Sequence, residues 1–235
     1  LFLGLGTGIT LAAAGPHPDL TAEGVELIPE IPEILHHFEP QNRLRYGLRV
    51  HVADARRFVR ATPDHYDVIV ADLFHPARDG AGALYTLEHF HALRSRLAPG
   101  GVICQWLPLH QLDEEMLRVI VRTFLDVFPN SQAFLLRFNV DTPVLGLIAG
   151  GEPMVFPPDW LAHRVQDQAL AKELRSLTLQ DELHLLGCYL AGPKTLRDYS
   201  IDAPFNTDDS PVVMFRAPEF AFRRHETGYG RLLST

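Results

Sequence analysis

The first ten residues, Leu1 to Thr10, constrain the fold of this chain more than any other stretch. Three apolar residues predict a short buried strand, which runs into a turn with glycine at every second position, Gly4, Gly6 and Gly8. The apolar residues 11–14 then predict the start of a helix. Glycine is required in such a turn because the backbone bends sharply and passes close to a ligand, where a Cβ atom would collide. The stretch therefore predicts a strand-turn-helix unit that binds a nucleotide or a nucleoside.

A carboxylate at the expected distance strengthens this interpretation. Glu26 ends a second apolar run, roughly 20 residues beyond the turn, where dinucleotide-binding units place the acid that binds the ribose hydroxyls. The turn lacks the last glycine of the dinucleotide fingerprint, and no Lys-Ser/Thr pair follows it as in a P-loop. A nucleoside that carries a sulfonium, with no phosphate to bind, therefore fits better than NAD or ATP. The alternative is a glycine-rich turn that binds no ligand.

Composition limits the class of protein further. The chain has 235 residues, 46% hydrophobic and 21% charged, which suits one large or two small globular domains. A net charge of -8 argues against nucleic acid as a partner, because phosphate binding requires a basic surface. Cys104 and Cys188 lie in apolar stretches and are typical of reduced core residues in a cytoplasmic protein. No apolar run reaches the ~18 residues of a membrane span, so we expect no membrane contact by this segment.

Strands alternate with helices through the first 150 residues. This rhythm predicts a Rossmann-like, doubly wound α/β fold with a mostly parallel, seven-stranded sheet. The last two strands, at 132–138 and 144–149, are joined by a short polar turn, which predicts a hairpin and one antiparallel edge strand. We assign residues 1–150 to a nucleoside-binding core and 151–235 to a mainly helical extension. Within the extension, Val212 to Phe215 is interpreted as a short strand.

Several polar residues fall where predicted strands end: Glu26, Asp54, Asp72 and Gln105. The carboxyl ends of parallel strands share one edge of a sheet, and ligands of such folds bind there. A single acid after a strand is also a common helix cap, and Asp54 has the position of an N-cap for a helix over 55–61. It is the coincidence of these residues with the glycine turn that predicts a ligand site at this edge.

Five stretches of the chain together resemble the polyamine aminopropyltransferases, the family of spermidine synthase. They are Gly4–Gly8, Val25–Glu26, Val52–Ala55, Tyr66–Asp72 and Gly100–Gln105. The similarity is greatest to bacterial spermidine synthase-like proteins that are often fused to membrane segments. It covers about residues 1–150 and implies the fold of the class I methyltransferases.

The resemblance implies a role for each residue at the strand ends. Glu26 would bind the ribose hydroxyls, and Asp54 with the Ala55 backbone would meet the adenine. Asp72 would be the general base, because an amine is nucleophilic only when deprotonated. The donor would be decarboxylated S-adenosylmethionine, whose aminopropyl group is transferred to an amine such as a polyamine. The full set of implied donor-binding residues is Gly4, Gly6, Gly8, Glu26, Asp54, Ala55 and Leu73.

The chain departs from the family pattern in the loop after Asp72. The family has Asp-x-x-Asp-Pro, whereas this chain has His75 at the second acidic position. A neutral histidine does not anchor an ammonium group as a carboxylate does. Three interpretations remain open: the acceptor differs, Asp79 or the pair Asp208–Asp209 replaces the charge, or no polyamine binds. We name His75, Asp79 and Gln105 as candidate acceptor-binding residues.

Two other functions also remain open. One is a methyltransferase that uses S-adenosylmethionine, and the other is a degenerate nucleoside-binding domain, which Thr7 and His75 favour because the family has acids there. The twelve histidines lack the spacing of metal ligands, so no metal is expected. The family's N-terminal β domain is missing, and the first residue already belongs to a core strand. We therefore expect a piece of a longer protein, to which a homodimer contact or a membrane domain can belong.

Overall fold

The computed structural model describes residues 1–15, 17, 19–39, 48–72, 75–78, 80–136, 142–154, 157 and 159–222. These residues form two compact units, which are described one at a time. Unit 1 comprises Leu1–Ala61 and Met154–Tyr189, and unit 2 comprises Thr62–Pro153 and the chain from Leu190 onward. The domain division near residue 150 stays a prediction.

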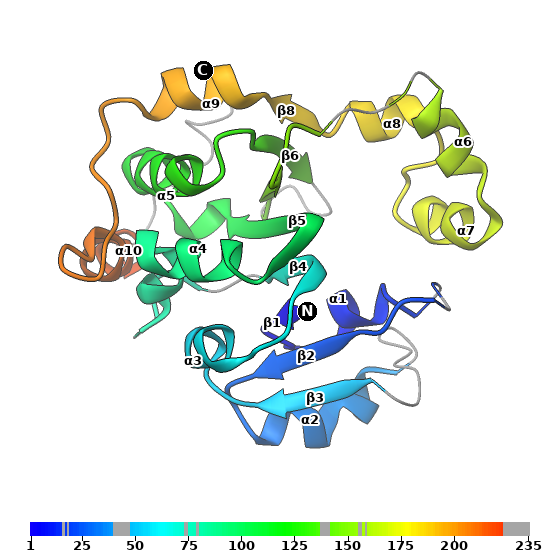
Figure 1. Ribbon diagram of the computed structural model, residues 1–235, viewed down its shortest axis with the longest axis horizontal. Helices are drawn as coiled ribbons and strands as arrows, with labels where there is room; N and C mark the ends of the chain where they lie inside the picture. The colour runs from blue at the N-terminus through cyan, green and yellow to red at the C-terminus, as the bar shows by residue number, and fades with distance from the viewer. Residues whose placement is uncertain are drawn as a thin grey trace. The chain divides into compact units, whose positions relative to one another are not determined.

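Unit 1 contains three short parallel strands in the order β3-β2-β1 (Figure 1). Leu3 pairs with Val25, and Glu26 pairs with Val52, so the three strands end at one edge. The residues that follow the strands are therefore neighbours, as the sequence predicts. The elements of unit 1 are β1 (Phe2–Leu3), α1 (Ile9–Ala12), β2 (Glu23–Glu26), α2 (Glu30–Ile34), the 3-10 helix η1 (Leu35–Phe38), β3 (Arg49–Val52), α3 (Ala55–Ala61), α6 (Trp160–Gln166), α7 (Gln168–Ser176) and α8 (Glu182–Leu186).

Unit 2 combines a parallel strand pair with a hairpin. Strand β4 runs parallel to β5, with Ala71 opposite Gln105, and β7 runs antiparallel to both β5 and β6. The predicted hairpin of β6 and β7 is confirmed. The elements of unit 2 are β4 (Tyr66–Ala71), η2 (Ala81–Tyr85), α4 (Leu87–Arg94), β5 (Leu97–Pro108), η3 (Leu109–Gln111), α5 (Glu114–Val127), β6 (Gln132–Leu136), β7 (Val144–Gly150), β8 (Tyr189–Ala191), α9 (Pro193–Ser200) and α10 (Val212–Phe222).

The strands are those of a mostly parallel, eight-stranded sheet with antiparallel pairing confined to one end. This arrangement confirms the predicted Rossmann-like α/β class. It holds one strand more than predicted, because β8 forms at the end of a stretch that the sequence predicts to be helical. No helix within the described ranges is long and apolar enough to cross a membrane.

The strand predicted at Val212 to Phe215 is wrong, because these residues begin helix α10. Val213 and Ala217 are both fully buried and lie one helical turn apart, so the helix packs one apolar face into unit 2. The backbone N–H of Val213 donates to the Asn206 side-chain oxygen at 3.1 Å. Four apolar residues are too few for periodicity to separate a strand from a helix.

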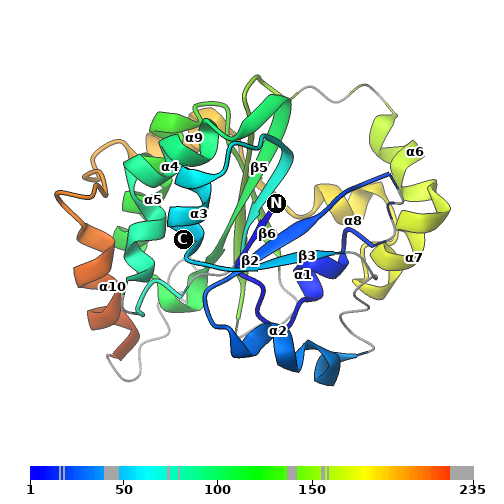
Figure 2. The same cartoon turned by 60° about the horizontal axis from the view of Figure 1, so that its bottom comes forward.

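Asn206 links four segments of unit 2 through a buried set of hydrogen bonds. Its backbone N–H donates to Thr123 Oγ1 at 2.9 Å, and its side-chain Nδ2 donates to the Gly82 carbonyl at 3.2 Å. Its backbone carbonyl accepts from Leu87 N–H at 2.9 Å, and its Oδ1 accepts from Val213. Helices α4, α5 and α10, which these bonds connect, group on one side of the strands of unit 2 (Figure 2).

Candidate functional site

The glycine turn, Gly4 to Gly8, leads directly from β1 into α1. Gly4, Gly6 and Gly8 all have positive φ, at 83°, 50° and 79°, which L side chains rarely adopt. A Cβ atom added at Gly6 would meet nothing within 4 Å, so this side of the turn is open. The conformation predicted from the glycine spacing is therefore present, with free space for a ligand beside Gly6.

Glu26 fastens the glycine turn to the end of β2. Its Oε2 accepts hydrogen bonds from the backbone N–H groups of Leu5 at 3.0 Å and Gly6 at 3.2 Å, and its Oε1 accepts from Ile28 N–H at 3.0 Å. The residue is only 8% exposed. A carboxylate has about four lone-pair positions, so about one remains for a ligand. The sequence does not predict this structural role, and binding of the ribose hydroxyls stays a prediction.

Asp54 lies two residues beyond the end of β3. Its Oδ1 accepts from Arg57 N–H at 2.8 Å, so the predicted N-cap of α3 is confirmed. The side chain is exposed, and the neighbouring Ala55 is the first residue of the helix. Because β2 and β3 are paired to their ends, Asp54, Ala55 and Glu26 share one edge of unit 1. Contact with adenine stays a prediction.

The predicted base Asp72 directly follows β4 in unit 2 and is half-buried. Its neighbour Ala71 pairs with Gln105 on β5, and Gln105 is completely buried. Gln105 Nε2 donates to the Trp106 carbonyl at 3.1 Å, while Gln105 Oε1 has no hydrogen-bond partner within the described residues. The pKa of the Cys104 thiol is raised to about 12 by burial and by the negative charge of Asp72. Asp72 thus follows β4 at the end that pairs with the carboxyl-terminal half of β5.

The other candidate acceptor-binding residues differ in their surroundings. His75 Nδ1 lies 2.5 Å from Gln111 Nε2, and Gln111 Nε2 lies 3.2 Å from His110 Nε2. Leu73 and Asp79 lie outside the described residues. Asp208 and Asp209 are exposed, and the Asp208 N–H donates to Glu88 at 2.9 Å. The contact of His75 with Gln111 is not predictable from the sequence, because 36 residues separate the two.

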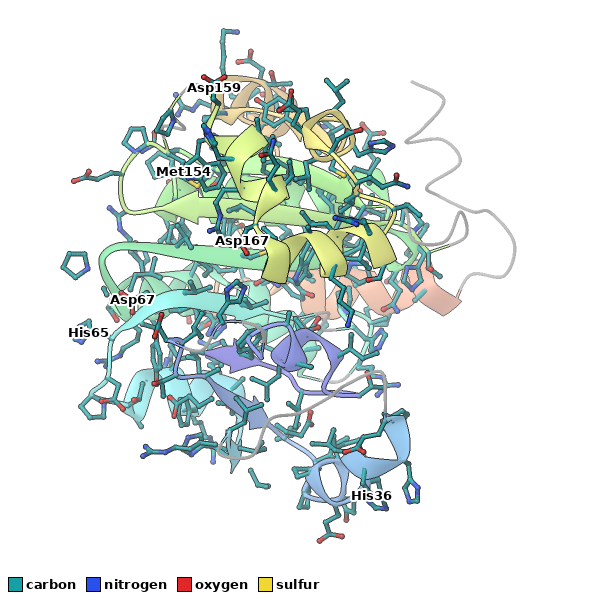
Figure 3. All side chains as sticks on the ribbon, turned by 90° about the vertical axis from the view of Figure 1, so that its right-hand side faces the viewer. His36, His65, Asp67, Met154, Asp159 and Asp167 are labelled. Atoms are coloured by element: carbon teal, nitrogen blue, oxygen red, sulfur yellow. The ribbon has the colours of Figure 1, made fainter. Side chains whose placement is uncertain are left out.

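His36 is an example of a histidine with only local polar contacts. It lies exposed on η1, where its Nδ1 donates to the Glu33 carbonyl at 2.9 Å (Figure 3). Within the described ranges, no group of histidine, cysteine and acidic side chains could hold a metal ion. Twelve histidines in the sequence therefore yield no metal centre in the part of the chain that the structure describes.

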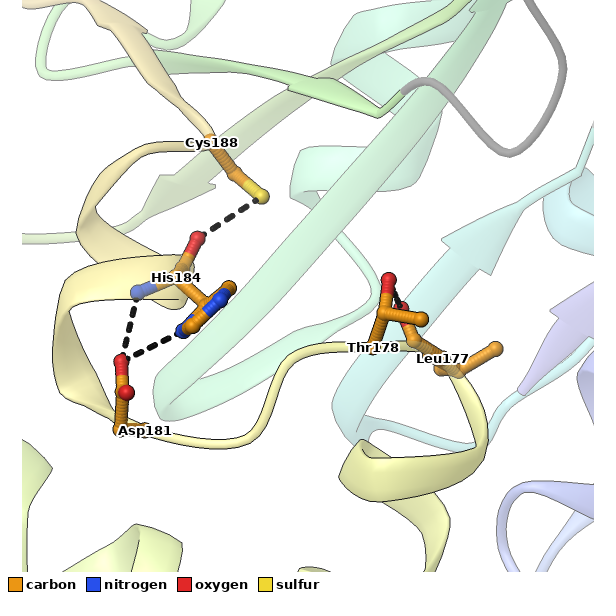
Figure 4. A network of polar contacts seen from close by, with 5 residues as sticks. All are labelled: Leu177, Thr178, Asp181, His184 and Cys188. Carbon is orange, nitrogen blue, oxygen red and sulfur yellow. Dashed lines mark hydrogen bonds and ion pairs between the residues drawn. The ribbon is translucent and has the colours of Figure 1, made fainter.

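Asp181, His184 and Cys188 lie together around α8 (Figure 4). Asp181 Oδ1 accepts from the backbone N–H of His184 at 3.0 Å and contacts its Nδ1 at 2.7 Å. The Cys188 thiol, however, donates to the His184 carbonyl at 3.5 Å rather than to the ring. Burial also raises the pKa of the Cys188 thiol, so the protonated form is favoured. Asp181 therefore caps α8. The three side chains do not form a cysteine nucleophile with a histidine base.

Gly6→Ala tests whether the open side of the glycine turn binds a nucleoside. The variant should lose only ~1 kcal/mol of stability from backbone strain. If the nucleoside packs against Gly6, the new methyl group should weaken binding of methylthioadenosine by about tenfold or more, equivalent to ~1.4 kcal/mol. Gly100→Ala is the matched control, since Gly100 has φ 76° and is equally open. If calorimetric titration gave equal affinities of the two variants for methylthioadenosine, the nucleoside would not bind at this turn.

Comparisons with known proteins agree with the observed fold. Residues 36–140 match the spermine/spermidine synthase domain. The polyamine aminopropyltransferase 2 of Pseudomonas aeruginosa is 30% identical over 164 residues, which are 68% of this chain and 46% of the relative. The polyamine aminopropyltransferase of a Synechococcus species is 29% identical over 169 residues, 70% of this chain and 54% of the relative. The chain spans about half the length of the curated relatives it matches.

Solved structures support the fold alone. The spermidine synthase of Thermotoga maritima aligns with a TM-score of 0.66 at 18% identity, over 85% of this chain and 66% of that one. A probable spermidine synthase of Corynebacterium glutamicum aligns with a TM-score of 0.61 at 20% identity, over 88% and 71% of the two chains. The strand order and these likenesses define a Rossmann-like protein with the spermidine synthase fold. In sequence, the chain is similar to the polyamine aminopropyltransferases over the matched residues.

Proposed function

We propose that this chain transfers the aminopropyl group of decarboxylated S-adenosylmethionine to an amine. The curated relatives are named polyamine aminopropyltransferases, and one structure with the same fold is a spermidine synthase in complex with the transition-state analogue AdoDATO. In this chain, the glycine turn, Glu26, Asp54 and Ala55 would bind the nucleoside. Asp72 would be the general base, with Gln105 beside it.

The observation that supports the proposal is the pairing of Ala71 with Gln105, because the backbone of Asp72 is then adjacent to a residue whose amide oxygen is unsatisfied. Gln105 Oε1 is buried and has no hydrogen-bond partner in the described part of the chain. Leaving such an acceptor unpaired costs about 1–3 kcal/mol, so a ligand N–H is expected to pair with it. An amine can offer one N–H to Gln105 and another to Asp72. Its lone pair then remains free to attack.

The proposed reaction is a single displacement. The amine nitrogen uses its lone pair to form a bond to the propyl carbon next to the sulfonium. The carbon–sulfur bond breaks, its electron pair stays on sulfur, and methylthioadenosine leaves as a neutral thioether. The amine loses one proton, which Asp72 accepts. Holding the nitrogen in line with the breaking bond lowers the entropic part of the barrier.

A titration with two donors tests the proposal. The chain should bind decarboxylated S-adenosylmethionine at least about tenfold more tightly than S-adenosylmethionine, a difference of ~1.4 kcal/mol. The reason is that the first 15 residues contain no Lys or Arg to pair with the carboxylate of the latter. The measurement is isothermal calorimetry of the full chain, followed by detection of methylthioadenosine after an amine is added.

Each outcome of this titration decides between the open functions. Tighter binding of S-adenosylmethionine together with methyl transfer would identify a methyltransferase. Binding of methylthioadenosine without transfer to any amine would identify a degenerate nucleoside-binding domain. Release of methylthioadenosine that requires both the decarboxylated donor and an amine would establish aminopropyl transfer.

A further inference from the structure

Three polar side chains meet beyond the carboxyl ends of β4 and β5. His75 comes from the loop after β4, and His110 and Gln111 come from η3, which directly follows β5. The Gln111 Nε2 atom lies 2.5 Å from His75 Nδ1 and 3.2 Å from His110 Nε2. We call these three residues the imidazole-amide cluster. Because Asp72 is three positions before His75, the cluster and the proposed base share the carboxyl edge of unit 2.

The hydrogen bonds of Gln111 determine where the two imidazole protons lie. The amide nitrogen has two N–H donors and no acceptor, so both ring nitrogens that face it must accept. With the amide nitrogen facing both rings, the ring protons sit on His75 Nε2 and on His110 Nδ1. Burial and the nearby His75 lower the pKa of His110, which also favours the neutral ring. The cluster thus holds two N–H donors, His75 Nε2 and His110 Nδ1.

One of these donors is buried and unsatisfied. His110 Nδ1 is shielded from solvent and has no hydrogen-bond partner within the described residues. A buried N–H without an acceptor is costly, and an oxygen atom of a ligand would satisfy it. An ammonium group would not, because it carries donors only. The chemistry of the cluster therefore matches a hydroxyl or a carboxylate.

We propose that the imidazole-amide cluster binds a hydrogen-bond-accepting oxygen at the far end of the amine substrate. The acceptor of this chain is then an amino alcohol or an amino acid with its amine at the other end, rather than a diamine. The inference rests on the proposed aminopropyl transfer and names its substrate class. Asp72 and Gln105 hold the attacking nitrogen, while His75 and His110 hold the oxygen.

Four acceptors of equal chain length test the substrate class. They are 1,4-diaminobutane, 4-aminobutan-1-ol, 4-aminobutanoate and butylamine, and the readout is kcat/KM for release of methylthioadenosine by the full chain. We expect the amino alcohol or the amino acid to exceed both the diamine and butylamine by about tenfold or more, as a buried hydrogen bond predicts. Comparison of the two oxygen compounds with each other separates a hydroxyl from a carboxylate.

Two variants connect the preference to the cluster. His75→Asp replaces an N–H donor by a carboxylate and should shift the preference toward the diamine by about tenfold. Gln111→Leu should raise KM for the oxygen-containing acceptor by a larger factor than KM for butylamine, a difference that a general loss of structure would not produce. His65→Asp is the control, because His65 is exposed and precedes the amino end of β4 (Figure 3).

The failure of this inference can be distinguished from the failure of the proposed function. If the diamine reacts fastest with the unaltered chain, the oxygen rather than the nitrogen of the Gln111 amide faces the two rings, and the inference is wrong. The proposed aminopropyl transfer then still stands. Equal rates for butylamine and the amino alcohol would contradict the inference in the same way. If no acceptor reacts, ¹⁵N spectra of the histidine rings still test the cluster. The His110 signals should then shift on addition of 4-aminobutan-1-ol or 4-aminobutanoate, and unchanged signals would overturn the inference.

Discussion

Asp72→Asn is expected to lower turnover by about 10²- to 10⁴-fold, the range typical of removing a general base. The amide keeps the size of the carboxylate but cannot accept a proton from the amine. Affinity for methylthioadenosine should remain within about twofold, since Asp72 is not among the residues assigned to the nucleoside. The measurements are single-turnover kinetics with the decarboxylated donor and calorimetry with the product.

The matched control for this prediction is Asp67→Asn. Asp67 lies near the amino end of β4, the strand that Asp72 directly follows, and is exposed (Figure 3). Its removal changes the net charge of the chain equally and should leave turnover unchanged. If Asp72→Asn retained full turnover, the assignment of the base would be wrong.

A thiol in the neighbouring strand provides an independent readout of the Asp72 charge. Burial and the Asp72 charge raise the pKa of Cys104 to about 12. Removing the charge should lower this pKa, so more thiolate forms at a given pH and alkylation is faster in Asp72→Asn. Measured in a Cys188→Ser background near pH 10, the rate should rise in Asp72→Asn and stay constant in Asp67→Asn. Equal rates in all variants would place the Asp72 carboxylate away from β5.

Asn206→Leu is expected to destabilise the chain by roughly 2–5 kcal/mol. The leucine cannot bond to the Gly82 carbonyl or to Val213 N–H, and it leaves both backbone groups buried without these partners. A loss of this size is a large part of the total stability of a typical domain, which is about 5–15 kcal/mol. The midpoint of urea unfolding should fall accordingly.

Thr207→Val is the control for the Asn206 prediction. The Thr207 hydroxyl accepts from Ser210 N–H at 3.0 Å, but this bond is exposed, so its loss should cost less than about 1 kcal/mol. The difference between the two variants measures what the two buried side-chain bonds of Asn206 contribute beyond one exposed bond of its neighbour. If Asn206→Leu cost no more than Thr207→Val, Asn206 would not connect η2 with α10.

Local patterns in the sequence predicted features in which the backbone needs only its near neighbours. The glycine turn requires positive φ, and alternate glycines supply it wherever the turn lies. Asp54 caps α3 through the N–H group three residues ahead, so this cap is visible in a short window. The hairpin of β6 and β7 follows in the same way from two apolar runs and a short polar turn.

Features that depend on distant partners were not predicted from the sequence. The segment at Val212 became a helix because its buried face and its bond to Asn206 exist only in the packed unit. Strand β5 begins at Leu97, earlier than its apolar run, because pairing with β4 extends it through the glycines before Val102. Neither outcome is encoded in the local apolar pattern, since short apolar runs suit both kinds of element.

By itself, the sequence determined the fold class, the similarity to the aminopropyltransferases and the positions of Glu26 and Asp72 at strand ends. The tertiary structure alone decided that Glu26 fastens the glycine turn and that His75 joins Gln111 and His110 in one cluster. The physical reason is range. Propensities, caps and turns act over a few residues, whereas hydrogen bonds between segments 20 or more residues apart exist only after the chain has packed.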